Sequence, residues 1–241
     1  MQEKSRIHKD EYPEISEDDI VDRDSFRPDI SMVVIKRLPR YFRYLRELIR
    51  MGKTRVSSAE LSRMMNVTAS QIRQDLNCFG GFGQQGYGYN VNYLYTKICG
   101  ILGVGCGFHA AVVGAGNLGS ALVKSPTFEK RGVDVVAMFD VAPGIIGRKI
   151  ADVKVYDMTE LERRLEELMV DIVILTLPKE FAADVAGRLA GTRIRGIWNF
   201  TGKELDLHES GIVVENVHIG DSLMTLCYEI AVNENNRKQK D

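Results

Sequence analysis

Three glycines and one aspartate carry the clearest chemical signal in the sequence. The pattern Gly114-x-Gly116-x-x-Gly119 follows an apolar run at 109–113, and the next apolar run ends at Asp140, 21 residues after Gly119. At this spacing glycines allow a tight turn, let the backbone approach a pyrophosphate and let a helix pack closely on a strand. The helix directs its N-terminus at the phosphates, and the acid binds the ribose hydroxyls. The spacing predicts a dinucleotide site that prefers NAD(H) to NADP(H), because a carboxylate repels a 2′-phosphate.

Further candidate ligand contacts follow the later strands of the same predicted sheet. Apolar runs at 171–175 and 196–200 alternate with helical patterns, which is typical of a doubly wound parallel sheet. Such a sheet binds its ligand at the carboxyl ends of its strands. The alternative for the strand-end residues is an ordinary loop without ligand contact. The expected dinucleotide contacts are Gly114, Ala115, Gly116, Asn117, Leu118, Gly119, Asp140, Thr176, Leu177, Pro178 and Asn199.

Two capping boxes predict a helix-turn-helix earlier in the chain. Ser57-x-x-Glu60 and Thr68-x-x-Gln71 each pair an N-cap oxygen with a side chain three residues later, and the link between the two helices is very short. The second helix, residues 69–79, is the expected recognition helix, because its exposed face carries side chains that bind base edges or phosphates. The alternative is an ordinary helical hairpin.

A longer helix is predicted ahead of this pair. Ser31 suits the cap of a short helix that runs to Leu38, and Pro39 suits the first turn of the next helix. Apolar residues then recur at spacings of three and four up to Ile49, which indicates one buried face. Gly52 is a natural stop.

The glycine-rich segment 80–90 follows the expected recognition helix directly. Five glycines and three aromatic residues in this segment favour a β-hairpin or loop over a helix. In this position the hairpin is interpreted as a wing whose backbone approaches DNA closely. The expected DNA contacts are Arg55, Ser57, Ser70, Gln71, Arg73, Gln74, Gly83, Gln84, Gln85 and Tyr87.

Charge is distributed unevenly over the 241 residues. The net charge is −1, yet residues 29–105 carry 11 Lys and Arg against 4 Asp and Glu, whereas the flanking segments are acidic. A basic block inside a near-neutral protein indicates a polyanion partner for that block, the alternative being a solvated basic face. The 44% of hydrophobic residues is typical of a globular protein. No signal peptide or membrane span is expected, so a cytoplasmic location follows.

The sequence offers no obvious catalytic or metal constellation. The four cysteines form no C-x-x-C pair and have no histidine at metal-ligand spacing, so no metal is expected. No histidine pairs with a carboxylate, and Tyr93-x-x-x-Lys97 precedes the nucleotide loop, so it is interpreted as helix surface. We therefore expect a binding protein and not an enzyme. The alternatives are an NAD-dependent oxidoreductase with a helical accessory domain, and a CoA-binding domain.

These patterns divide the chain into four parts. Residues 1–28 form an acidic extension, residues 29–105 a winged helix-turn-helix DNA-binding domain with its linker, and residues 106–220 a Rossmann-type α/β domain with a doubly wound parallel sheet. Residues 221–241 form a C-terminal helix and a charged tail, NENNRKQKD, that is expected to fray.

The chain resembles the Rex family of redox-sensing transcriptional repressors. The motifs that carry the resemblance run in order from about Ile30 to Ala231: ISMVVIKRLPRYFRYLREL, TASQIRQDLNCFGGFGQQGYGYNV, VVGAGNLGSAL, FDV, LTLP, GIWNF and VVENV. The resemblance implies a homodimer that exchanges its C-terminal helix and binds pseudo-palindromic double-stranded operator DNA when NADH is low. It also implies that NADH and NAD⁺ are the ligands, and that NADH closes the dimer and moves the winged helices out of register with the DNA.

The resemblance also implies an interdomain switch, from which this sequence departs. The family links Arg46 to an acid after the VENV motif and to a tyrosine after the nucleotide-binding helix. In this chain those two positions are His218 and Ser125, and Asp221, three residues beyond His218, is expected to replace the missing acid as a partner of Arg46.

Overall fold

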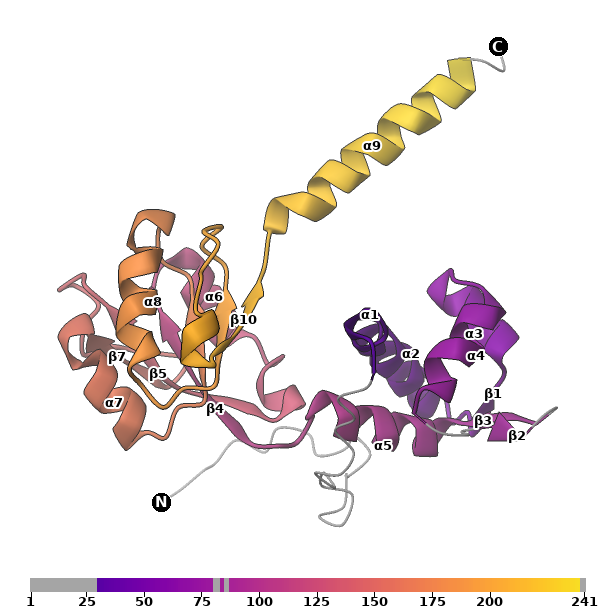
Figure 1. Ribbon diagram of the computed structural model, residues 1–241, viewed down its shortest axis with the longest axis horizontal. Helices are drawn as coiled ribbons and strands as arrows, with labels where there is room; N and C mark the ends of the chain where they lie inside the picture. Colours follow the sequence, from indigo (N-terminus) through magenta and orange to yellow (C-terminus); the bar gives the residue numbers. More distant parts are fainter. Residues whose placement is uncertain (1–29, 80–82, 85–86, 239–241) are drawn as a thin grey trace. The chain divides into compact units, whose positions relative to one another are not determined.

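The computed structural model describes residues 30–79, 83–84 and 87–238. The chain falls into two compact units divided between Cys106 and Gly107 (Figure 1). The predicted acidic extension, residues 1–28, lies outside the described residues.

The N-terminal unit is built from helices and a small sheet. Its sheet has the order β1-β3-β2, with antiparallel pairing throughout. The elements in chain order are α1 (Met32–Ile35), α2 (Leu38–Arg50), β1 (Arg55–Val56), α3 (Ser58–Met65), α4 (Ala69–Asn77), β2 (Gly83–Gln84), β3 (Gly88–Asn90) and α5 (Val91–Leu102).

Local signals set most helix ends in this unit. The side chain of Ser57 accepts a hydrogen bond from the Glu60 N–H, and that of Thr68 accepts one from the Gln71 N–H, so each predicted cap forms. Helix α1 ends at Ile35 and not at Leu38 as predicted. Leu38 instead begins α2, because the proline that follows it starts a new helix readily and does not continue the previous one.

The core of the N-terminal unit lies between α2 and α5. Leu38, Leu45 and Leu94 are buried, and the rings of Phe42 and Tyr95 stack with their centroids 5.2 Å apart. Buried side chains of α3, α4 and β3 complete the same cluster. This packing holds α4 with one face against the core and the other exposed, as a recognition helix requires.

The C-terminal unit is an α/β domain around a seven-stranded sheet of order β10-β9-β8-β4-β5-β7-β6. All pairs are parallel except that of β6 with β7. The elements are β4 (Phe108–Val113), α6 (Asn117–Lys124), β5 (Val133–Asp140), β6 (Lys149–Ile150), β7 (Val153–Asp157), α7 (Leu161–Glu167), β8 (Ile172–Leu175), α8 (Ala182–Ala190), β9 (Gly196–Asn199), β10 (Val213–Asn216) and α9 (Ile219–Lys238).

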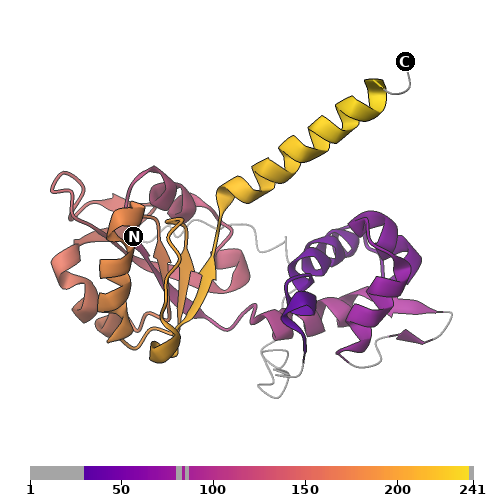
Figure 2. The ribbon, with the colours of Figure 1, turned by 45° about the horizontal axis from the view of Figure 1, so that its top comes forward.

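Helices cover both faces of this sheet, as the doubly wound prediction requires (Figure 2). Ala111 and Val113 of β4 pack with α7 and α8, whereas Ala110 and Val112 pack on the face that carries α6. From β4 the chain first adds β5, β7 and β6 on one side and then adds β8, β9 and β10 on the other, so the strand order reverses between β4 and β8. Doubly wound sheets bind ligands at the carboxyl ends of the strands at such a point.

The last helix, α9, differs from the rest of the unit in its exposure. Six of its large apolar side chains are at least half exposed: Ile219, Leu223, Met224, Leu226, Tyr228 and Ile230. The expectation that the charged tail frays is wrong for residues 233–238, which continue the helix. Among the helices of the described residues, none has the length and apolar character that crossing a membrane requires.

Candidate functional site

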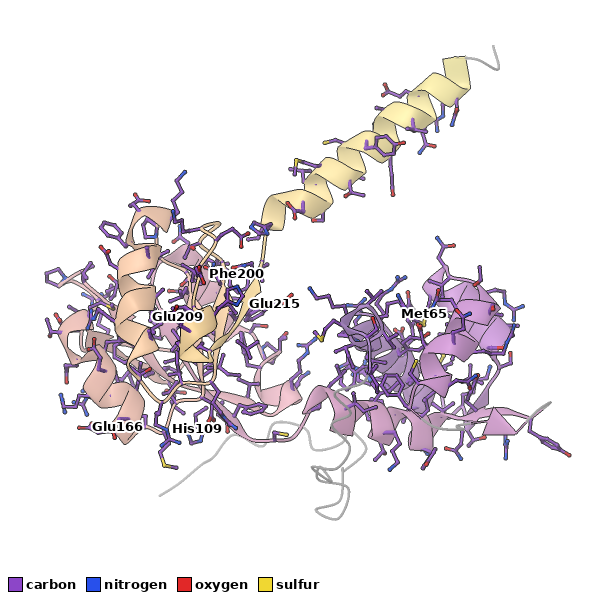
Figure 3. The ribbon with its side chains drawn as sticks, in the orientation of Figure 1. Met65, His109, Glu166, Phe200, Glu209 and Glu215 are labelled. Atoms are coloured by element: carbon purple, nitrogen blue, oxygen red, sulfur yellow. The ribbon has the colours of Figure 1, made fainter. Side chains whose placement is uncertain are left out.

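A cavity of about 760 Å³ lies at the carboxyl edge of the parallel sheet. Six of the predicted ligand contacts line it: Gly114, Gly116, Asp140, Thr176, Leu177 and Pro178. Phe200, which directly follows β9, marks this carboxyl edge, and His109 near the start of β4 marks the opposite edge (Figure 3). His109 is structural, because its backbone N–H donates to Asp171 and its ring contacts the Leu168 carbonyl.

The three glycines of the predicted loop have different physical roles. Gly114 has a φ of +100°, and a Cβ there would lie 2.9 Å from the backbone of Thr176. A Cβ at Gly119 would lie only 2.0 Å from the Gly114 carbonyl oxygen. At Gly116 nothing lies within 4 Å of a Cβ. Gly114 and Gly119 therefore build the turn, and Gly116 leaves the space that a phosphate would fill.

The first turn of α6 forms the end of this loop and has no side-chain cap. Gly116 is the N-cap, and the first backbone bond of the helix runs from the Ser120 N–H to the Gly116 carbonyl. The preceding N–H groups of Asn117, Leu118 and Gly119 thus have no helical partner, which is the usual arrangement at an anion-binding helix terminus.

Asp140 ties the glycine loop to the end of β5. Its Oδ2 accepts a hydrogen bond from the Ala115 N–H at 2.7 Å, and its Oδ1 accepts one from the Ala142 N–H at 2.9 Å. Each carboxylate oxygen has a second lone pair, and Asp140 lines the cavity. The same side chain can hold the loop and accept from ribose hydroxyls.

Two residues predicted as ligand contacts hold the structure together. Thr176 lines the cavity, but its Oγ1 donates to the Gly114 carbonyl at 2.7 Å and so fixes the turn. Asn199 is 2% exposed and is not among the cavity-lining residues. Its amide donates to Lys203 O and Asn216 Oδ1 and accepts from Thr201. The Asn199 amide thus holds the loop after β9, and its contact with a ligand stays a prediction.

The cavity also includes residues that the sequence patterns did not single out as ligand contacts. Val141, Met158, Phe181, Asp184, Val185 and Arg188 line it as well. Arg188 donates to Glu162 and to the Met158 carbonyl, which fastens α8 to the segment before α7. Phe181 and Val185 are four residues apart, which is typical of one face of a helix, but this spacing does not indicate that the start of α8 reaches the ligand edge.

The predicted DNA-binding residues lie on β1, at the start of α3, on α4 and in the wing. Ser70, Arg73 and Gln74 are exposed on α4, and Ser57 caps α3. Arg73 Nη1 donates to Ser58 Oγ at 3.3 Å, so the Arg73 side chain extends from α4 to the start of α3.

Arg55 of β1 donates to the Tyr87 carbonyl of the wing, and its guanidinium lies 5.9 Å from the Tyr87 ring. Gly83 and Gln84 form β2. Gln85 lies outside the described residues.

Sequence reasoning missed a buried carboxylate on the inner face of α4. Asp75 of α4 is 1% exposed and accepts from Arg37, Tyr41 and Gln71. Burial raises the pKa of the Asp75 carboxyl, but the hydrogen bonds from Arg37, Gln71 and Tyr41 outweigh burial and hold that pKa below its usual value. The side-chain amide nitrogen of Gln71, a predicted DNA contact, is therefore bonded to Asp75.

The predicted switch residues are divided between the two units. Arg46 lies on α2, with its guanidinium 5.9 Å from the Phe42 ring. Ser125 follows α6 directly and accepts from the Thr127 N–H. His218 immediately precedes α9, 3.4 Å from Glu204 and 4.0 Å from Asp221. Asp221 therefore lies beside the position whose acid it was expected to replace as a partner of Arg46.

The fold and the cavity define a two-domain protein that joins a winged helix to a dinucleotide-type α/β domain. In the described part of the chain, no three His, Cys, Asp or Glu side chains are arranged to hold a metal ion. The family described as "CoA binding domain" matches residues 108–202, and the family described as "Putative DNA-binding protein N-terminus" matches residues 29–77.

Curated relatives identify the family. The chain is 52% identical to the redox-sensing transcriptional repressor Rex of Clostridium beijerinckii over 200 residues, 83% of this chain and 94% of that protein. It is 47% identical to the Thermoanaerobacter pseudethanolicus protein of the same name over 216 residues, 90% of this chain and 96% of that one. The chain belongs to the Rex family of redox-sensing transcriptional repressors.

Solved structures agree. A structure of RSP in complex with β-NAD⁺ and operator DNA matches with a TM-score of 0.80 and 46% identity, over 89% of this chain and 98% of that one. A structure of RSP in complex with β-NADH matches with a TM-score of 0.80 and 43% identity, over 88% of this chain and 100% of that one.

Proposed function

We propose that this chain is a redox-sensing transcriptional repressor that binds operator DNA as a dimer and is released by NADH. It thereby reports the cellular ratio of NADH to NAD⁺, and its access to operator DNA requires a cytoplasmic location. The observation that carries the proposal is the glycine cradle with Asp140 in the same chain as an exposed recognition helix. Membership of the Rex family supports it.

The two redox forms must be distinguished at the nicotinamide end. NADH and NAD⁺ share the adenosine and pyrophosphate, so contacts made by Gly116 and Asp140 do not discriminate between them. An apolar, water-poor environment for the nicotinamide disfavours the cationic ring of NAD⁺. Only a difference in affinity between the released and DNA-bound states shifts the equilibrium. A 100-fold difference supplies about 2.7 kcal/mol of coupling free energy, and bound DNA then lowers the affinity for NADH by the same factor.

A phosphate on the ribose is disfavoured at this site. Arg188 is the one cation among the described cavity-lining residues, and it is already bonded to Glu162. The ribose phosphates of CoA and NADPH would meet Asp140 without a free cation nearby. We therefore propose NAD(H) as ligand, with no catalytic reaction. Sustained turnover of NADH with small carbonyl substrates would contradict the absence of catalysis.

The deciding experiment is fluorescence anisotropy of the purified chain on a labelled palindromic operator at fixed salt. We expect release by NADH, and neither NADPH nor an equal concentration of NAD⁺ should release the protein. Operator binding that is indifferent to NADH would contradict redox sensing. Absence of operator binding would contradict the repressor proposal as a whole and favour the oxidoreductase alternative.

The ribose contact gives a first prediction. Asp140→Ala removes the carboxylate and weakens binding of NADH and NAD⁺ by about 10- to 100-fold each, because the ribose hydroxyls then have no charged group to donate to. Operator affinity is unchanged. Isothermal titration with each dinucleotide measures the effect, and Asp134→Ala, an exposed aspartate of the same strand, is the control. Unchanged NADH affinity would contradict the assignment of Asp140.

The recognition helix gives a second prediction. Arg73→Ala weakens operator binding and lowers the slope of log affinity against log salt concentration by about 0.9 for each phosphate that the protein no longer neutralises. NADH affinity is unchanged. Arg163→Ala removes an exposed arginine from α7 and controls for net charge. If the Arg73 variant keeps the wild-type salt dependence, Arg73 does not contact phosphate.

Two apolar surfaces of the C-terminal unit support the dimer. Helix α9 carries Ile219, Leu223, Leu226 and Ile230 at helical spacing along one side. A groove of about 540 Å³ lies over β8, β9 and β10, and Phe128, Trp198 and Val213 are among its lining residues. Apolar surfaces of this kind mark interfaces. We propose that a second copy of the chain covers them.

The dimer gives a third prediction. Leu226→Glu places a charge on the apolar side of α9, so we expect a monomer by light scattering and weaker operator binding. Cys227, beside it on α9, then reacts faster with N-ethylmaleimide than in the wild type, with exposed Cys78 as internal reference. Thr225→Glu, on another side of the helix, keeps the dimer. Equal labelling of Cys227 in both forms would contradict burial of this face.

A further inference from the structure

The buried carboxylate of Asp75 determines how Gln71 is presented on α4. Asp75 Oδ1 accepts from Gln71 Nε2 at 2.8 Å and from Arg37 Nη2 at 2.5 Å. Its Oδ2 accepts from Arg37 Nε at 2.8 Å and from Tyr41 at 2.9 Å. Arg37 lies between α1 and α2 and Tyr41 lies on α2, so the carboxylate is fixed from outside the recognition helix.

An ionised carboxylate only accepts hydrogen bonds. The Gln71 side chain must therefore turn its amide nitrogen, and not its carbonyl oxygen, toward Asp75. The carbonyl oxygen of Gln71 has no hydrogen-bond partner among the described residues. A glutamine free in solvent presents either end of its amide, but this one is held in a single orientation.

The orientation matters because Gln71 stands in the first turn of α4, where recognition helices contact base edges. In the major groove, an outward carbonyl accepts from the amino group of adenine N6 or cytosine N4, and is repelled by the acceptors of guanine and thymine.

We propose that Asp75 is a positioning residue for sequence recognition, which fixes the Gln71 amide so that its carbonyl selects a base amino group in the major groove. The inference rests on the proposed operator binding and deepens it. Asp75 itself is buried and does not touch DNA.

The test removes single amino groups from the operator. In one series each adenine is replaced by unsubstituted purine, which lacks the 6-amino group, and in another each cytosine by pyrimidin-2-one, which lacks the 4-amino group. Affinity is measured by anisotropy for the full-length wild type, Gln71→Ala, Asp75→Asn and the double variant, together with affinity for random DNA. Ile98→Val, a substitution in the core that leaves this network intact, controls for lost stability.

We expect one position in each half-site at which the wild type loses about 10-fold in affinity when the amino group is removed. Gln71→Ala should show no loss there. Asp75→Asn should show a much reduced loss and should have no further effect in the Gln71→Ala background. This non-additivity distinguishes positioning from structural support, because a structural role would add its effect in either background. The Ile98→Val control should keep the full 10-fold sensitivity.

Two results would overturn the inference. One is an Asp75→Asn variant with undiminished sensitivity, and the other is a Gln71→Ala variant that keeps the wild-type loss at every position. If Asp75→Asn does not fold, the pair Arg37→Gln with Asp75→Asn removes both charges and takes its place. A wild type that binds operator no better than random DNA would instead refute the proposed function, so the two failures are distinguishable.

Discussion

Replacing Gly119 by alanine is expected to abolish the response to NADH and to leave operator binding intact. A Cβ at this position lies 2.0 Å from the carbonyl oxygen of Gly114 and 2.8 Å from Thr176 Oγ1. The first contact is with backbone, so the turn itself must open. Because α6 starts in this turn, the N–H groups that face the phosphates are displaced. We expect NADH affinity to fall at least 100-fold, about 2.7 kcal/mol.

Two further glycine variants separate loss of ligand binding from loss of fold. Gly187→Ala makes the same change in α8, where nothing lies within 4 Å, and should behave as the wild type. Gly116→Ala should keep the wild-type melting temperature and still weaken NADH and NAD⁺ equally, because its methyl group occupies the space reserved for a phosphate. Isothermal titration and operator anisotropy measure both functions. If Gly119→Ala binds NADH within threefold of the wild type, the phosphate cradle lies elsewhere.

The parts of the fold that sequence reasoning predicted depend on neighbours in the chain. The side chains of Ser57 and Thr68 accept hydrogen bonds from N–H groups three positions later, and the glycine pattern spans only the six residues 114–119. Alternating apolar runs and helices then predict the sheet, because parallel strands need crossover helices. The cavity follows from this topology, which places the carboxyl ends of β4, β5 and β8 side by side.

The parts that it did not predict depend on residues far apart in the chain. Arg37 and Asp75 are 38 positions apart, and nothing local indicates that they meet. The same limit applies to Asn199, whose strand-end position predicts ligand contact, although Asn216 and the loop after β9 occupy its amide. A polar residue at a strand end is available to a ligand only when tertiary partners leave it free.

The end of α9 shows a different limit. Its polar residues after Val232 were expected to fray because they cannot bury apolar surface. Asparagine, glutamate, arginine and lysine are nevertheless compatible with a helix that is already nucleated, since each added residue gains one backbone hydrogen bond. The helix therefore continues to Lys238. Composition alone does not separate the continuation of a helix from its end.

Removal of Arg37 should destabilise the winged helix strongly. Arg37→Ala leaves Asp75, which is 1% exposed, without its ion partner. Breaking a buried pair in this way costs about 3–5 kcal/mol, and we expect the lower end because the Arg37 side chain is 24% exposed. Urea unfolding followed by circular dichroism measures the loss. The single tryptophan, Trp198, lies in the other unit, so its fluorescence transition should not move, and Arg63→Ala on α3 is the exposed control.

Acid should reduce the difference in free energy of unfolding between Arg37→Ala and the wild type. Hydrogen bonds from Arg37, Gln71 and Tyr41 overcome burial and lower the pKa of Asp75 in the folded state. A lowered folded pKa gives stability that is present above the unfolded value of about 3.9 and is lost as the pH falls through the folded value. The variant lacks the ion pair, and burial then favours the neutral acid, so it gains relative stability on acidification. A difference in free energy of unfolding of about 3 kcal/mol at pH 7 should therefore begin to shrink above about pH 4, as Asp75 of the variant becomes protonated, and should shrink further as the pH falls through the lowered pKa of Asp75 in the wild type. A gap that stays constant from pH 7 to pH 3 would show that Arg37 acts through packing and not through the charge of Asp75.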